Sequence, residues 1–289
     1  MARARLAAIR GFGAAGMTGL LSAGLIFAGV ASAAAAAAPA GAEPAFAAFD
    51  RTRELGRISP HLPLYVVYGP QSPEAKYQLS FKYRLFSAPG DGDLRGVYFG
   101  YTQRGLWDAG APSSPFFDTS YMPELFWASL SPSESYAAGG GAHWLGYHAG
   151  VQHESNGKDG AASRSLNTAY ARPIVMFGDL GGWNLVLAPK IFAYFGSLED
   201  NPLIADYRGY VEWTAVFGKK DDLSFSVLGR TGRRFDRGSV EVGVTHPVRI
   251  PAAGFASFAM LQWFEGYGES MLSYDRRSSA IRIGLAFVR

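Results

Sequence analysis

Alternating apolar and polar side chains recur along most of the chain, and this period of two constrains the fold more than any other feature. Near the C-terminal end, Val240, Val242 and Val244 alternate with Ser239 and Glu241. Such alternation is typical of a β-strand with one buried face. Twelve such runs are separated by turn-forming residues: 62–69, 76–86, 95–107, 120–130, 142–155, 163–177, 183–195, 205–217, 222–232, 237–248, 254–267 and 278–288.

A soluble β-sandwich and a membrane β-barrel both produce this alternation. Most of the runs exceed the usual strand length of about 5–6 residues, their number is even, and aromatic residues gather near their ends. The chain has no cysteine, so disulfides cannot stabilise it. We therefore expect an all-β protein, a twelve-stranded antiparallel transmembrane β-barrel with lipid outside and a polar lumen.

The first residues indicate export. Arg3, Arg5 and Arg10 precede a small, apolar stretch at 13–30, and a small-x-small cleavage pattern follows at 31–33. A membrane anchor is the alternative, but the Ala and Gly content favours cleavage. The predicted organisation is a signal peptide over 1–38 with cleavage somewhere in 33–42, an N-terminal lead-in over 39–60 and the barrel domain over 61–289.

The charge balance argues against nucleic acid as a partner. The chain has 27 Lys and Arg against 24 Asp and Glu, and three of the arginines lie in the predicted signal. Removing them leaves 24 basic residues against 24 acidic ones. The mature protein is therefore close to neutral and lacks the basic surface that nucleic acids require.

Three polar residues interrupt the apolar, lipid-facing side of two neighbouring predicted strands. His153 and Ser155 continue the face of Tyr147 and Val151, and Asn167 lies on the next strand. A serine needs a base to become a nucleophile, and His153 on the same face can supply one. The amide oxygen of Asn167 can orient the imidazole. Gly157 offers an unobstructed N–H for an oxyanion, and a bound cation would assist it.

A glutamine raises a separate question. Gln103 shares the apolar face of its strand with Val97, Phe99 and Tyr101. An amide facing hydrocarbon is costly unless a partner satisfies it, so this position predicts a contact between subunits.

These motifs resemble the bacterial outer membrane phospholipase A family. HESNGKDGAASRSLN, residues 153–167, is similar to that family's active-site hairpin, H-x-S-N-G followed by S-R-S-x-N, without a gap. Further segments resemble the family in the same order: KYQLSFKYRLF at 76–86, YTQRGLW at 101–107, SSPFFDTSYMPELF at 113–126 and GYGESMLSYD at 266–275. The resemblance covers most of 60–289.

The resemblance implies a calcium-dependent enzyme of the outer membrane that hydrolyses acyl esters of phospholipids, of A1/A2 and lysophospholipase type, and is active as a homodimer. It assigns Ser155 as nucleophile, His153 as base, Asn167 as orienting residue and Gly157 to the oxyanion hole. By the same resemblance Ca²⁺ is held by the Ser163 hydroxyl, the Lys158 carbonyl and a serine of the partner matching Ser113, with Gln103 at the dimer interface.

The chain departs from the family pattern at a few positions. Lys158 stands where Arg is usual, which matters little for a backbone carbonyl, and the 103–113 loop is shorter. The shorter loop leaves Ser114 as an alternative to Ser113.

Two other functions fit an outer membrane barrel. A passive porin needs an open lumen, whereas the predicted lumen face carries the bulky residues Trp144, Tyr170, Arg172 and Glu212. A lipopolysaccharide deacylase is disfavoured only by the family resemblance.

Overall fold

The computed structural model describes residues 57–88, 95–131, 141–179, 181–219, 221–250 and 255–289. The predicted signal peptide and most of the lead-in lie outside these residues. The strands are β1 (Ile58–Pro60), β2 (Leu64–Tyr68), β3 (Ala75–Ser87), β4 (Arg95–Trp107), β5 (Phe116–Leu130), β6 (Ala142–Ser155), β7 (Ser165–Gly178), β8 (Trp183–Leu187), β9 (Lys190–Phe195), β10 (Val211–Lys219), β11 (Ser224–Thr231), β12 (Gly238–Ile250), β13 (Phe255–Tyr267) and β14 (Arg277–Val288).

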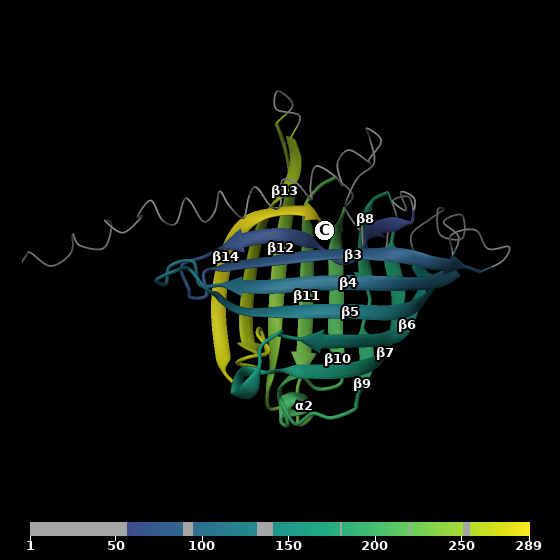
Figure 1. Ribbon diagram of the computed structural model, residues 1–289. Helices are drawn as coiled ribbons and strands as arrows, with labels where there is room; N and C mark the ends of the chain where they lie inside the picture. The colour runs from purple at the N-terminus through teal and green to yellow at the C-terminus, as the bar shows by residue number, and fades with distance from the viewer. Residues whose placement is uncertain (1–56, 89–94, 132–140, 180, 220, 251–254) are drawn as a thin grey trace, which may run out of the picture.

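These segments form one closed antiparallel barrel with twelve strand positions. β1 and β2 both pair with β3, and β8 and β9 both pair with β7 and β10, so each pair of segments is one interrupted strand. The ring closes where β14 pairs with β2, which Figure 1 shows as the yellow strand beside the blue ones. The prediction of a twelve-stranded barrel is confirmed.

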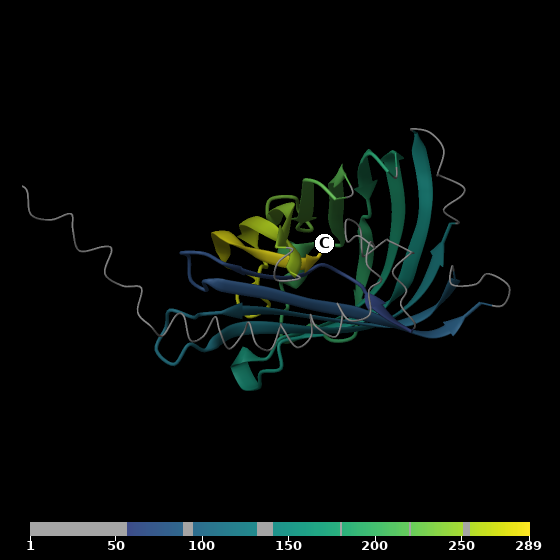
Figure 2. The ribbon, with the colours of Figure 1, turned by 90° about the horizontal axis from the view of Figure 1, so that it is seen from above.

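The closed sheet provides partners for its own backbone groups. Seen from above in Figure 2, the sheet curves round on itself, and the pairing of β14 with β2 joins its two ends. In a bilayer every backbone N–H and C=O needs a partner within the protein, and a closed barrel meets that requirement. Among the described residues, no helix is long and apolar enough to cross a membrane.

Three local expectations were wrong. Residues 205–208 belong to a short helix, α2 (Ile204–Arg208), and not to a strand. Trp144 faces outward and is 52% exposed, while Leu145 is buried inside, because the register shifts between Trp144 and Gly146 and reverses the alternation there. The single strand expected at 183–195 is divided into β8 and β9.

The barrel interior is largely polar and crossed by ion pairs. Lys76 on β3 contacts Glu241 on β12 at 2.5 Å, although three strand positions separate them around the wall. Glu212 on β10 pairs with Arg230 at 2.6 Å. Buried charges of this kind are tolerated only when paired and hydrogen-bonded. The lumen is thus a packed polar core.

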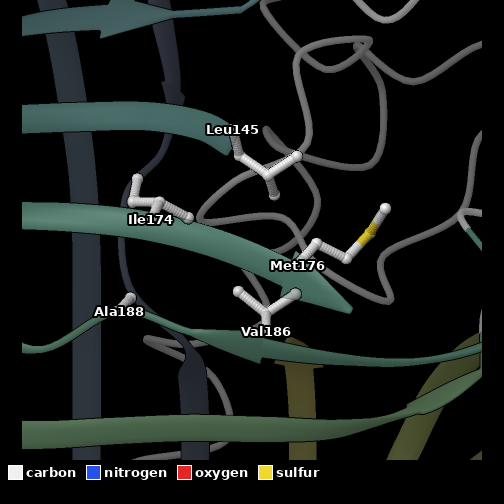
Figure 3. Close-up of a cluster of buried hydrophobic side chains, with 5 residues drawn as sticks. All are labelled: Leu145, Ile174, Met176, Val186 and Ala188. Carbon is white, nitrogen blue, oxygen red and sulfur yellow. The ribbon is translucent and has the colours of Figure 1, made fainter. Parts of the chain in front are cut away.

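Apolar side chains fill the two ends of the lumen. One cluster, drawn in Figure 3, gathers Leu145, Ile174, Met176, Val186 and Ala188 from β6, β7 and the β8–β9 segment. At the opposite end, α2 and the loop between β13 and β14 form a second cluster with the start of β7, made of Leu166, Ile204, Tyr207, Met271 and Tyr274. The loops joining β6 to β7, β9 to β10 and β13 to β14 all lie at this second end, by strand order.

Candidate active site

The predicted triad residues lie at the end of β6 and the start of β7. In the register of this pair His153 is directly opposite Asn167, and Ser155 is opposite Ser165. His153 Nδ1 and Asn167 Oδ1 are 2.9 Å apart. Because an amide oxygen can only accept, this bond places the proton on Nδ1 and leaves Nε2 available as a base. The structure therefore brings the predicted base and the predicted orienting residue into contact.

Ser155 lies two residues beyond His153 on the same strand face, roughly 7 Å along the strand. It is half-buried, whereas its neighbours Glu154 and Asn156 are buried in the barrel, at 6% and 4% exposure. Ser155 and His153 thus share the outer face at the rim. Contacts between a catalytic serine and its base are often long without substrate and shorten when it binds.

Two features of the structure favour glycine at position 157. Its φ of +65° lies in the left-handed region. A Cβ there would also come within 3.0 Å of the Tyr121 ring. The turn after Ser155 therefore depends on glycine, and it directs the chain into the β6–β7 loop.

The two calcium ligands predicted from one chain lie on this loop. Lys158 precedes and Ser163 follows a short 3-10 turn, Gly160–Ala162, which Figure 1 shows at the same end of the barrel as α2. The Lys158 ammonium donates to the Phe117 carbonyl at 3.0 Å, so its side chain is engaged elsewhere. The Ser163 hydroxyl donates to the Asp200 carboxylate at 3.1 Å.

Asp200 was missed by sequence reasoning. It lies in the β9–β10 loop and also accepts, at 3.4 Å, from the Ser165 hydroxyl. No local motif marks it, because Asp200 lies 37 residues beyond Ser163 and meets that hydroxyl only through the pairing of β7 with β9. Among the described residues there is no cluster of three or more His, Asp, Glu or Cys side chains suited to a metal. Any cation here would depend on hydroxyl, carbonyl and single carboxylate oxygens.

The serine expected to reach a partner's calcium lies in the β4–β5 loop. Ser113 and Ser114 both have positive φ, at 66° and 42°. The Ser114 hydroxyl donates to the Ala109 carbonyl at 3.1 Å, and its own carbonyl accepts from Trp107. Ser113 is exposed. This geometry favours Ser113 over Ser114 for a contact outside the chain.

Gln103 lies on β4 between two tyrosines. Its Nε2 donates to the Tyr77 hydroxyl at 2.9 Å, and its Oε1 accepts from the Tyr101 hydroxyl at 3.0 Å. Part of the cost of placing an amide on the lipid-facing wall is therefore met within one chain. A carboxamide has two N–H donors and two acceptor lone pairs, so each end keeps capacity for a partner.

Asn156 organises the loop that follows Ser155, and sequence reasoning also missed it. Its Oδ1 accepts from the backbone N–H groups of Arg164 at 3.0 Å and Lys158 at 3.3 Å. Its Nδ2 donates to the Ala162 carbonyl at 2.9 Å. One buried side chain thus holds both ends of the segment that carries Gly157 and Ser163.

Known proteins are similar to this chain over most of its length. The family model for phospholipase A1 matches residues 58–287. The chain belongs to the phospholipase A1 family. Such membership supports a lipid ester hydrolase, and the barrel together with the relatives below places it in the outer membrane as a multi-pass β-barrel.

Curated relatives include a putative phospholipase A1 of Neisseria meningitidis, 33% identical over 74% of this chain and 54% of that protein. The chain thus spans about half the length of this relative. Phospholipase A1 of Klebsiella pneumoniae is 30% identical over 73% of the chain and 69% of that protein.

Among solved structures, outer membrane phospholipase A from Escherichia coli has a TM-score of 0.67 and 25% identity, covering 79% of this chain and 91% of that one. The Salmonella typhi protein, solved as a dimer with bound calcium, has a TM-score of 0.68 and 23% identity, covering 85% of this chain and 98% of that one.

Proposed function

We propose that this protein is a calcium-dependent phospholipase of A1/A2 and lysophospholipase type that acts through Ser155, His153 and Asn167. The observation that carries the proposal is the 2.9 Å contact between His153 Nδ1 and Asn167 Oδ1, made beside Ser155 on the outer rim of the barrel. Phospholipid ester bonds lie at the boundary between headgroups and hydrocarbon, and we infer that the rim of the barrel lies at this boundary. The outward face gives them access without passage through the lumen.

The chemistry follows from the tautomer that Asn167 selects. His153 Nε2 removes the proton of the Ser155 hydroxyl as Oγ attacks the ester carbonyl carbon. The N–H of Gly157 is available to donate to the resulting oxyanion. The imidazolium then returns its proton to the departing alcohol, which leaves an acyl-enzyme. Water, activated by the same imidazole, attacks this ester and releases the fatty acid.

Asn167 differs from the usual aspartate because it is neutral. It fixes the imidazole through one hydrogen bond and adds no charge to stabilise the imidazolium. A solved form of the Escherichia coli relative, 25% identical, is an active-site mutant in which an asparagine is replaced by alanine. That relative therefore supports an asparagine in this role.

The residues present fit a calcium ion. The Ser163 hydroxyl, the Lys158 carbonyl and the Asp200 carboxylate offer the hard oxygen ligands that Ca²⁺ prefers, on one loop and its neighbour. A calcium ion held by these residues would supply positive charge that favours an oxyanion. Asn156 contributes by holding the loop on which Lys158 and Ser163 lie.

We further propose that the active form is a homodimer. Ser113 of the partner subunit would complete the calcium site, and Gln103 would meet its counterpart across the lipid-facing wall. The exposure of Ser113 and the remaining hydrogen-bonding capacity of Gln103 support this arrangement. The related Salmonella typhi protein has been solved as a calcium-bound dimer. Separating the subunits would then switch off an enzyme that resides in its own substrate.

A passive porin fits the interior poorly. The pair Lys76–Glu241 crosses the lumen, and the network around Glu212 and Arg230 occupies it further. A cavity of about 200 Å³ between these strands is lined by Glu212, Arg230 and Glu241 themselves. An open water-filled passage would require these buried pairs to separate, at a cost of several kcal/mol each.

Fatty-acid release from defined phospholipid micelles, with calcium or with chelator, tests the proposal. We expect activity only with calcium and none in Ser155→Ala or His153→Ala. Ser163→Ala should raise the calcium concentration needed for half-maximal activity. Lys158→Ala is the matched control, since only its backbone carbonyl is required, and its calcium response should match the wild type. Full activity of Ser155→Ala, or of the wild type in chelator, would refute this function.

A further inference from the structure

Ser155 is flanked by two side chains that point into the barrel and are connected to the same loop by hydrogen bonds. Glu154 and Asn156 are both buried, while Ser155 between them faces outward. The loop in question joins β13 to β14 across residues 268–276 and folds into the mouth of the barrel, against α2. We call residues 268–276 the inner brace.

The first connection runs through Asp118 on β5. Its Oδ2 accepts from the Ser270 hydroxyl at 2.9 Å and from the Leu272 N–H at 2.8 Å, both in the brace. Its Oδ1 accepts from Asn156 Nδ2 at 3.3 Å. Asp118 is 2% exposed. A single buried carboxylate thus joins the brace to the residue that follows the nucleophile.

The second connection runs through Arg208 at the end of α2. Its Nη1 donates to Glu154 Oε2 at 2.9 Å, and its Nη2 donates to the Gly268 carbonyl at 3.1 Å. Arg208 is 4% exposed. A planar guanidinium with two fixed donor directions suits such a bridge. The residue before the nucleophile is therefore held by the same loop.

The brace itself is fixed to the barrel wall. Glu269 accepts from Arg282 Nη1 at 2.6 Å and from Lys76 Nζ at 3.2 Å. Met271 and Tyr274 are buried in the apolar cluster beside α2, at 0% and 6% exposure. The loop is thus anchored by ion pairs and by packing, so it can hold the end of β6 in place.

We propose that the inner brace positions the nucleophile, with Asp118 and Arg208 as positioning residues that hold the β6 end from inside the barrel. This rests on the proposed function. Ser155 must keep its outer face open to lipid, so support from that side would block substrate. Strand ends at a rim fray readily, and a displacement of about 1 Å at a reacting group can cost on the order of 10²-fold in rate.

The test compares variants of the contact between Asp118 and Asn156 with a variant of a buried asparagine at the opposite end of the barrel. Asn156 serves the catalytic loop, whereas Asn184, 2% exposed, donates to the Asp179 and Gly182 carbonyls at the far end. Asn184→Ala removes a similar buried amide without touching the site. Asp118→Ala and Asp118→Asn complete the set, and the double variant of Asp118 and Asn156 measures their coupling.

Two readouts separate positioning from stability. One is kcat against KM for micellar phospholipid, and the other is the rate at which a sulfonyl fluoride labels Ser155 in folded, detergent-solubilised protein. In Asp118→Ala we expect kcat to fall by about 10²-fold, with KM nearly unchanged and labelling slowed in parallel. Asp118→Asn should be intermediate, and the double variant should lose less than the product of the single losses. Asn184→Ala should keep wild-type kcat and labelling.

If Asp118→Ala had the same kcat and labelling rate as Asn184→Ala, the positioning role of the inner brace would be refuted. The labelling comparison does not depend on phospholipid turnover. A wild type that is labelled at Ser155 but hydrolyses no phospholipid would refute the proposed function, and the labelling rates would still decide whether Asp118 positions Ser155.

Discussion

Replacing Asn167 by alanine is the most direct test of the His153–Asn167 contact. The variant removes one hydrogen bond of 2.9 Å between half-buried side chains. A neutral bond of this kind contributes about 0.5–1.5 kcal/mol net, and about 1.4 kcal/mol corresponds to tenfold in rate. The freed imidazole also populates the other tautomer, in which Nε2 carries the proton and cannot act as a base.

Together these effects predict a fall in kcat/KM of about 10- to 50-fold in Asn167→Ala, far less than the loss in Ser155→Ala. Asn167→Asp is the matched control, because it keeps an oxygen acceptor and adds a charge favourable to the imidazolium, so it should retain more activity than the alanine variant. The assay is fatty-acid release at saturating calcium, with folding checked by the heat-dependent mobility of the barrel in electrophoresis. Wild-type activity in Asn167→Ala would refute the orienting role.

Two further predictions concern assembly and acid stability. Gln103→Ala should weaken a calcium-dependent dimer by about 1 kcal/mol, seen as less crosslinked dimer in detergent with calcium and substrate analogue; unchanged crosslinking would remove Gln103 from the interface. Burial raises the pKa of Glu269, but the charges of Lys76 and Arg282 outweigh it and hold that pKa below the usual 4.5. The stabilisation from ionised Glu269 is therefore present above pH 4.5 and lost as pH falls below it. Glu269→Gln should lower the free energy of unfolding at neutral pH by about 3 kcal/mol, and the variant should lose less further stability than the wild type when the pH falls below 4.5. Equal melting temperatures of variant and wild type, at neutral pH and below pH 4.5, would contradict this.

Much of the site could be predicted because it lies within one hairpin. His153, Ser155 and Asn167 are brought together by a single antiparallel pairing, and a two-residue spacing puts His153 and Ser155 on one face. The bulge that turned Trp144 outward could not be predicted, because alternation carries no mark where an extra residue enters a strand. The helix at 204–208 was missed for a related reason: its apolar residues are buried by tertiary contacts with Met271 and Tyr274.

The sequence alone determined the barrel, its strand number and the hairpin that carries the candidate triad, because these depend on local alternation and on residues close in the chain. Tertiary structure decided what surrounds that hairpin. Asp200 meets Ser163 through the pairing of the neighbouring strands β7 and β9, whereas Asp118 meets Ser270 only once the ring has closed. The first contact spans 37 positions and the second spans 152. No periodicity encodes them, since they depend on how the closed barrel folds its loops into its own mouth.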